Sequence, residues 1–293
     1  MKIGITGAAG FLGGSLIEKL QRKGHSLKVF VRGGDYNFPE DVEVIHGDLA
    51  SGEGLEKFLS DVETVTHLAA RVTAPEEKMF EDNVAVTHNL VTELLKFPVK
   101  HLIFTSTVAV YGKDRKGKFK ESDKCFPNTE YGLTKLLAEK EIQYWSTRRG
   151  MPATILRPFN IYGPGNMKGI IYSFLSDIKN KGRAVIYGSG RQKRDFLYVD
   201  DFIEALLGVI DTKKSGIFNL GAPEKYSILD ILGMFRKIMK KDIEVEFDTK
   251  EEGKVFNIDQ DLSLAKKILK WEAKTELSDG LRETIEWYEG LKK

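Results

Sequence analysis

The sequence predicts an α/β protein in which a doubly wound parallel sheet carries a smaller C-terminal lobe. Strand-like apolar runs alternate with helical ones from Lys2 to about Arg157, and this alternation is typical of a parallel sheet covered by helices. Glycine and polar residues follow these runs, as expected where ligands bind at the carboxyl ends of parallel strands. The 293 residues are enough for one large core with an appended lobe.

The first expected strand, Ile3–Thr6, leads directly into a glycine-rich turn and then into a helix, Leu12–Arg22. Strand, glycine turn and helix in this order are typical of a Rossmann dinucleotide site, in which the pyrophosphate lies at the helix N-terminus. The spacing Gly-x-x-Gly-x-x-Gly is one residue longer than the usual form. The candidate cofactor residues of this turn are Gly7, Gly10, Phe11, Leu12 and Gly13.

The next two strands, Leu27–Val31 and Val42–His46, are expected to end beside the adenosine. An acidic residue after the first of them would favour NAD, but Arg32 stands there. Because arginine pairs well with phosphate, Arg32 favours NADP, whereas Asp35 leaves NAD open. Asp48, with Leu49 beside it, follows the second strand and is expected at the adenine, unless Asp48 only shapes the turn after Gly47.

Tyr131 and Lys135 are the candidate catalytic pair. They lie four residues apart, so on a helix they share one face. A free phenol has a pKa of about 10 and is a poor base at neutral pH. A nearby ammonium lowers that pKa, so Tyr131 is expected to act as a proton donor and acceptor. Thr107, after the expected strand Leu102–Ser106, would donate a hydrogen bond to the same substrate oxygen, and Lys135 could also hold the cofactor ribose.

The second half of the chain alternates less regularly. Residues 1–163 are expected to form the dinucleotide-binding domain and residues 164–293 mainly the substrate-binding lobe, with residues 199–220 returning to the sheet. Ser227 is the expected N-cap of one late helix. The remaining expected strands are Val65–Leu68, Thr154–Leu156, Ala184–Tyr187 and Ile217–Leu220; the helices are Gly169–Lys181, Ser227–Lys240, Leu262–Lys270 and Ser278–Tyr288.

Composition excludes several functional classes. The net charge of +2 gives no argument for nucleic acid or membrane binding. The single cysteine, Cys125, rules out an internal disulfide, and neither it nor the five histidines have metal-ligand spacing. We find no signal peptide and no apolar run long enough to cross a bilayer, so a reduced, cytoplasmic setting is expected.

Several segments, taken in order, resemble the extended short-chain dehydrogenase/reductase family, the NAD(P)-dependent nucleotide-sugar epimerases, dehydratases and reductases. Within it the chain is most similar to the UDP-glucose 4-epimerase type. The segments that carry the resemblance are His67–Ala70, Asn83–Leu90, Phe104–Gly112, Tyr131–Lys135, Arg157–Gly165, Arg194–Asp201 and Leu277–Tyr288.

This resemblance implies a role for several residues. The family's catalytic triad falls on Thr107, Tyr131 and Lys135. The resemblance also implies a homodimer formed through the helices Glu81–Lys96 and Glu130–Trp145. It places Leu68, Ala69, Ala70 and Pro158 at the cofactor, and Asn160 and Arg194 at the phosphates of a nucleotide-sugar substrate.

Some residues depart from the family pattern, and these departures reduce the number of candidate reactions. Val108 and Ala109 stand where the 4,6-dehydratases carry an acidic pair and the decarboxylases a glutamate, which leaves epimerases and reductases. The stretch Gly253–Phe256 also departs from the family, whose members often read the nucleotide there with Asp and Arg. Lys250 could substitute.

The leading hypothesis is an NAD(P)-dependent nucleotide-sugar epimerase that acts at C4 through a transient keto-sugar, with Tyr131 as acid and base. The alternative is an NADPH-dependent reductase of a keto-sugar nucleotide or a related carbonyl, which Arg32 supports. A non-catalytic NAD(P)-binding sensor is a third hypothesis, and the intact Tyr131 and Lys135 argue against it. The sequence leaves the sugar, the base and the direction of the reaction open.

Overall fold

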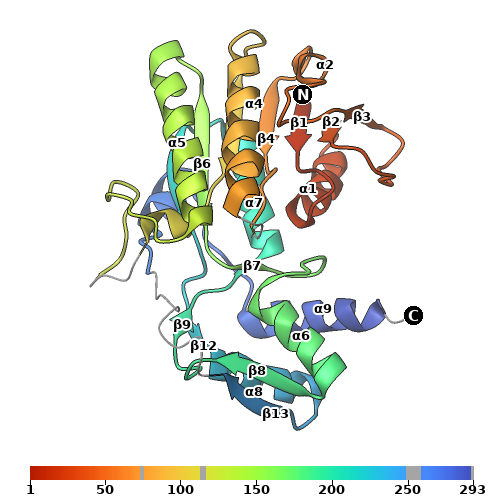
Figure 1. Ribbon diagram of the computed structural model, residues 1–293, viewed down its shortest axis with the longest axis vertical. Helices are drawn as coiled ribbons and strands as arrows, with labels where there is room; N and C mark the ends of the chain where they lie inside the picture. Colours follow the sequence, from red (N-terminus) through yellow and green to blue (C-terminus); the bar gives the residue numbers. More distant parts are fainter. Residues whose placement is uncertain (73–75, 113–116, 249–258, 292–293) are drawn as a thin grey trace.

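The computed structural model describes residues 1–72, 76–112, 117–248 and 259–291; Lys250 and Gly253–Phe256 lie outside them. A seven-stranded sheet fills the upper part of the molecule, and its neighbouring strands all pair in parallel (Figure 1). The predicted parallel sheet is therefore confirmed. Its order is β11 (Gly216–Leu220), β6 (Ala153–Pro158), β5 (His101–Thr105), β4 (Thr64–His67), β1 (Lys2–Thr6), β2 (Ser26–Val31) and β3 (Val42–His46).

Helices cover both faces of this sheet, because successive side chains of a strand point to opposite faces. On β5, Ile103 packs into one apolar core and Phe104 into the other. The first core lies under α1 (Phe11–Arg22) and α7 (Val199–Thr212), and the second under α2 (Leu55–Leu59), α4 (Val86–Leu94) and α5 (Glu130–Arg149). The short α3 (Glu76–Phe80) and the π-helix η1 (Glu81–Ala85) lead into α4.

A smaller group of elements lies below the sheet (Figure 1). Phe174, Phe235 and Ile285 from these elements belong to the same apolar core as α1 and α7, so this core continues from the sheet into the lower part. The larger lower elements are α6 (Gly169–Lys181), β8 (Arg183–Tyr187), α8 (Ile228–Met239), β13 (Glu244–Asp248) and α9 (Leu277–Gly290). Three strand pairs accompany them: β8 with β13, β7 (Ile161–Tyr162) with β10 (Leu197–Tyr198), and β9 (Lys193–Arg194) with β12 (Tyr226–Ser227).

Local signals predict some helix ends correctly and miss others. The Ser227 cap is confirmed: its Oγ accepts from Asp230 N at 3.0 Å, while the Asp230 carboxylate accepts from Ser227 N at 2.8 Å, which is a capping box. The predicted helix Leu262–Lys270 is shorter, a π-helical turn η4 (Ala265–Leu269) that ends where Lys270 takes a φ of 55°. The stretch predicted to be one helix from Glu81 divides into η1 and α4.

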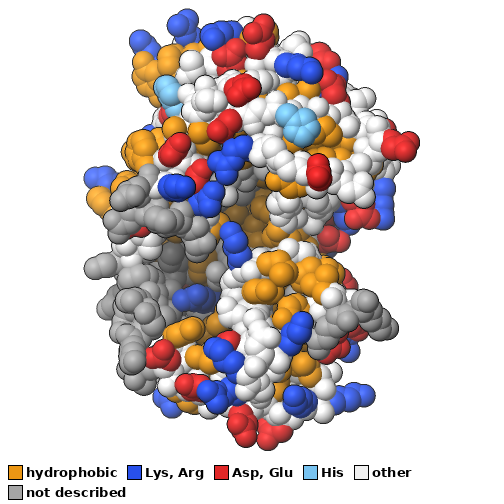
Figure 2. Space-filling view, turned by 45° about the vertical axis from the view of Figure 1, so that its right-hand side comes forward, with side chains coloured by type: hydrophobic (Ala, Val, Ile, Leu, Met, Phe, Trp, Pro, Cys, Tyr) orange, Lys and Arg blue, Asp and Glu red, His pale blue; other side chains and the backbone are white. Residues whose placement is uncertain are grey.

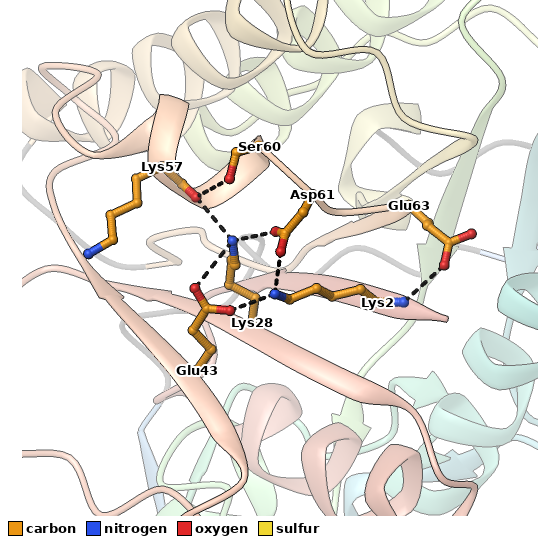
Figure 3. A network of polar contacts seen from close by, with 7 residues as sticks. All are labelled: Lys2, Lys28, Glu43, Lys57, Ser60, Asp61 and Glu63. Atoms are coloured by element: carbon orange, nitrogen blue, oxygen red, sulfur yellow. Dashed lines mark hydrogen bonds and ion pairs between the residues drawn. The ribbon is translucent and has the colours of Figure 1, made fainter.

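An ion network closes the end of the sheet where β1 begins (Figure 3). The Lys28 side chain is only 2% exposed, and its Nζ lies 2.5 Å from Asp61 and 3.3 Å from Glu43. Lys2 pairs with the same two carboxylates, at 2.5 Å and 2.6 Å. A buried ammonium is costly unless it is paired, so these acids stabilise the amino-terminal edge of β1, β2 and β3.

Within the described part of the chain, no helix is both long enough and apolar enough to cross a lipid bilayer.

Candidate active site

Two adjoining cavities open over the carboxyl ends of the central strands. β1 has β2 on one side and β4 on the other, so the strand order reverses there, which is where doubly wound sheets bind ligands. The outer cavity, of about 620 Å³, is lined among others by Arg32, Asp48 and Leu49. The inner cavity, of about 610 Å³, is lined among others by Thr107 and Tyr131. Both share Gly7, Ala9, Gly10, Leu68, Ala70 and Lys168.

Figure 2 shows the molecule hollowed between its upper and lower parts, with Lys and Arg side chains around the hollow. The inner cavity reaches from the sheet to the first residues of the lower part, since Asn166, Met167 and Lys168 line it. A ligand in this cavity would therefore touch both parts of the molecule.

The glycine turn between β1 and α1 fits a dinucleotide. Gly7 has a φ of +71°, and a Cβ there would lie 2.6 Å from the backbone N of Ala69, so a larger residue would block the approach of the two loops. Gly10 caps α1 without a side-chain hydrogen bond, and the first N–H groups of a helix have no partner within it. These N–H groups and the helix dipole suit the pyrophosphate. Gly13 is buried in α1, against the backbone of Ala8.

The outer cavity contains a shared carboxylate that the sequence alone does not indicate. Arg32 is 60% exposed, and its Nη1 lies 3.6 Å from Oδ1 of Asp82. Arg71 Nε lies 2.5 Å from the other oxygen of Asp82. Asp48 also lines this cavity, while its Oδ1 accepts from Ala50 N at 3.0 Å and so shapes the turn. The positive charge of Arg32 is therefore partly balanced inside the cavity.

The start of α5 brings Tyr131 to the same cavity as Thr107. The Thr129 side chain accepts from Gly132 N at 3.1 Å and caps the helix, which puts Tyr131 in its first turn. A Cβ on Gly132 would lie 2.5 Å from Ala109 O, so glycine lets α5 press against η2 (Val108–Tyr111). Thr107 Oγ1 accepts from Ala109 N at 3.2 Å. This bond uses a lone pair, so the hydroxyl can still donate to a substrate oxygen.

Lys135 lies one helical turn after Tyr131, on the same face of α5, and it is not among the residues that line either cavity. Its side chain is buried, and Nζ lies 4.0 Å from the ring centroid of Phe104, a cation–π contact. Burial lowers the pKa of Lys135 to about 7, although Glu139 acts in the opposite direction.

The predicted lowering of the Tyr131 pKa is wrong for the protein alone. Burial of the phenol raises the pKa of Tyr131 to about 12, because the phenolate loses its hydration when it is buried and the charged form becomes less favourable. Tyr131 is therefore a neutral phenol until a further positive charge lies close to it.

The remaining predicted residues lie in the inner cavity, in the outer cavity or outside both. Leu68, Ala70, Pro158 and Asn160 line the inner cavity, and Ala69 lines the outer one. Phe11 and Leu12 also line the inner cavity. Asn160 Nδ2 donates to Asp195 O at 3.1 Å, so it also anchors the segment next to Arg194. Arg194 lies on β9, opposite Tyr226 on β12, and outside the residues that line these two cavities.

Sequence reasoning missed Asp82, Lys168 and Glu139. Lys168 lines both cavities, but a single lysine in a loop gives no signal. Glu139 is fully buried, and its position four residues after Lys135 could have revealed it as a third member of the same helix face.

Comparison with known proteins agrees with this geometry. The family model described as "NAD dependent epimerase/dehydratase family" matches residues 3–221. The UDP-glucose 4-epimerase of Lactobacillus helveticus is 28% identical over 320 residues, which cover 98% of this chain and 97% of that protein. A UDP-N-acetyl-alpha-D-glucosaminuronate decarboxylase of Bacillus cytotoxicus is 29% identical over 316 residues, covering 97% and 96%.

Two solved structures are similar over the whole chain. The UDP-glucose 4-epimerase of Thermotoga maritima, solved with UDP-glucose, has a TM-score of 0.93 at 26% identity, and both chains are covered completely. The UDP-glucuronic acid 4-epimerase of Bacillus cereus, solved with NAD, has a TM-score of 0.90 at 28% identity, again with complete coverage. Because the family model spans most of the sequence, the chain belongs to the NAD dependent epimerase/dehydratase family.

Proposed function

We propose that this protein is an NAD-dependent UDP-sugar 4-epimerase. The observation that carries the proposal is the inner cavity, where Thr107 and Tyr131 line a space that adjoins the dinucleotide turn at Gly7. Family membership and the 4-epimerases among the similar proteins support it.

The chemistry follows from the roles of three side chains. A bound nicotinamide supplies a hydride acceptor and donor. Tyr131 takes the proton of the C4 hydroxyl and later returns it, while Thr107 donates a hydrogen bond to the same oxygen and fixes its position. Lys135 lies one helical turn after Tyr131 on α5, and as an ammonium it would favour the ionised phenol. The N-terminus of α5 acts in the same direction.

The substrate phosphates are assigned to residues between the two parts of the molecule. We assign Asn160 and Arg194 to the diphosphate, because a forked guanidinium and an amide suit its oxygens. Arg194 lies on the segment that Asn160 anchors through Asp195, so the two residues are coupled in position. The domain assignment, with residues 164–293 mainly holding the substrate, belongs to the same proposal.

We further propose NAD, rather than the NADP that Arg32 alone favours. Asp82 lies 3.6 Å from Arg32 and also pairs with Arg71, so a 2′-phosphate in the outer cavity would meet a carboxylate. The same pairing removes the residue support for the NADPH-dependent reductase. Mass spectrometry of the dinucleotide released on denaturation should find NAD; release of NADP would overturn this choice.

The function is tested by incubating the purified protein with NAD and, separately, with UDP-glucose, UDP-glucuronic acid and UDP-N-acetylglucosamine. Proton NMR of the sugar ring resolves the C4 epimers. We expect one of the three to form its 4-epimer without net consumption of NAD. Formation of a decarboxylated or reduced sugar, or of no product from any of them, would overturn the proposal.

A further inference from the structure

A buried polar cluster lies under the active site and is not used by the chemistry above. The Glu139 side chain is fully buried, and Arg157 is only 2% exposed. Glu139 Oε1 accepts from Ser106 Oγ at 2.5 Å and from Arg157 Nε at 2.9 Å, while Oε2 accepts from Arg157 Nη2 at 2.6 Å. One carboxylate therefore receives three hydrogen bonds, two of them from a paired guanidinium.

Each partner in this cluster is the neighbour of an active-site residue. Ser106 directly precedes Thr107 at the end of β5, and Arg157 directly precedes Pro158 at the end of β6. Glu139 itself lies one helical turn after Lys135 on α5. The carboxylate thus joins the three elements β5, β6 and α5, each of which carries residues of the site.

The cluster continues to the turn after Thr107. Arg157 Nη1 donates to the Tyr111 hydroxyl at 2.8 Å, and that hydroxyl donates to Oδ1 of Asn219 on β11 at 2.7 Å. The guanidinium also lies 4.8 Å from the Tyr111 ring centroid. In a low-dielectric interior such a network tolerates little misalignment, so it fixes η2, which follows Thr107, as well as the two strands.

We propose that Glu139 is a positioning residue that fixes Thr107 and Lys135 relative to one another, through Ser106 on one side and through α5 on the other. The inference rests on the proposed epimerase function, because that function gives the separation of Thr107 and Lys135 its importance.

The charge of Glu139 also influences Lys135 directly, in addition to the hydrogen bonds that position the site. Glu139 raises the pKa of Lys135 against the burial that lowers it. His67 on β4, which stacks on the Phe104 ring at 5.5 Å, is neutral because burial lowers its pKa to about 3. The groups that face Lys135 are Glu139 from α5, Phe104 from β5, His67 from β4 and, beyond Glu139, Arg157 from β6.

Three variants separate positioning from mere stability. Ser106→Ala keeps the ion pair and removes the link from Glu139 to the end of β5, at a residue that also lines the inner cavity. The double variant Glu139→Met with Arg157→Met removes both buried charges, and such replacements are often neutral or stabilising. Glu139→Gln alone leaves Arg157 uncompensated. Asp61→Ala serves as the matched control, since it disturbs a buried lysine at the opposite end of the sheet.

We expect Ser106→Ala to lower kcat about 10-fold and the double variant about 100-fold, the size typical of misplaced reacting groups, with KM and NAD affinity within about threefold. The double variant should unfold at nearly the wild-type urea concentration, and Asp61→Ala should lose stability but keep its kcat. A wild-type kcat in the double variant would overturn the proposal, whatever the kcat of Ser106→Ala.

A second readout does not depend on turnover. Lysine labelled with ¹³C at Cε reports the ionisation of Lys135 by NMR, with Lys135→Arg to assign the signal. In Glu139→Gln the pKa of Lys135 should fall by about one unit, and the alkaline limb of kcat/KM should move with it. An unchanged pKa would contradict the role of Glu139. A wild-type protein without any epimerase activity would instead contradict the proposed function and leave this titration interpretable.

Discussion

At the residue scale, burial decides the protonation states of Tyr131 and Lys135 and so their roles. Burial raises the pKa of Tyr131 to about 12 and lowers the pKa of Lys135 to about 7. The phenol is therefore a proton donor in the protein alone, and it becomes a base only when positive charge is brought close. This arrangement suits a reaction in which the same group must take a proton and then return it.

The first prediction concerns the Tyr131 hydroxyl. Tyr131→Phe should reduce epimerisation by at least about 10³-fold, within the range that a positioned acid/base contributes. NAD binding should change little, because the ring that lines the inner cavity remains. Tyr144→Phe is the matched control: this tyrosine lies on the same helix but is 54% exposed, and its loss should leave turnover unchanged. Turnover and NAD titration of both variants check the prediction, which equal activities would contradict.

The second prediction concerns the glycine turn. Gly7→Ala places a Cβ within 2.6 Å of Ala69 N at a φ of +71°, so the turn must open and NAD affinity should fall at least about 10-fold. Gly14→Ala, in α1, meets nothing within 4 Å and should stabilise the protein by up to about 1 kcal/mol. Calorimetric NAD binding and thermal melts distinguish the two. Wild-type affinity in Gly7→Ala would show that the turn does not hold the cofactor.

At the element scale, the sequence predicts those site residues whose surroundings lie within one continuous segment. Gly7 and the Tyr131–Lys135 pair are recognised because the strand, turn or helix around each residue is local. The partner of Arg32 could not be predicted, since Asp82 reaches it from η1, far along the chain. The same holds for Glu139, whose partners are Ser106, directly after β5, and Arg157 on β6. Burial of Tyr131, which reverses its expected pKa shift, likewise depends on packing between distant segments.

The third prediction belongs to the amino-terminal edge of the sheet. Asp61→Ala should lower the free energy of unfolding by about 1–2 kcal/mol. Complete loss of a buried partner costs more, but Asp61 is itself 51% exposed and Glu43 still faces Lys28. Urea denaturation measures the change. Glu40→Ala, an exposed acid near by, should cost less than about 0.5 kcal/mol, and equal effects in the two variants would contradict the account.

The same network predicts a pH dependence. Hydrogen bonds from Lys2 and Lys28 hold the pKa of Asp61 below its ordinary value of 3.8. Its stabilisation is therefore complete above that value and is lost as pH falls through the lower folded-state pKa. In wild type, stability should fall more steeply below pH 3.8 than in Asp61→Ala. Identical curves would show that the pairing contributes nothing.

At the scale of the whole molecule, we predict a second function for α5 besides carrying Tyr131. Its outer face exposes Leu133, Leu137 and Tyr144 by 48%, 39% and 54%, and α4 lies next to it. We predict that this face pairs with a second copy, in the homodimer that the family resemblance implies. Location in the cytoplasm likewise stays a prediction.

The fifth prediction tests that pairing. Leu137→Glu places a charge in the centre of the apolar face and should convert a dimer to a monomer. Leu229→Glu on α8 is the matched control, with 38% exposure, and should leave the assembly unchanged. Light scattering of the three proteins gives the mass. A wild-type monomer, or a dimer in all three, would contradict this interface.

The central claim is that the C4 centre is inverted by removal and internal return of a hydride. The most direct measurement uses a UDP-sugar that the enzyme converts, deuterated at C4, in ordinary water. We predict that mass spectrometry and NMR of the epimer find the deuterium still at C4, with no proton taken from the solvent. An epimer that has exchanged its deuterium for solvent hydrogen would mean inversion by deprotonation at carbon and would contradict the account.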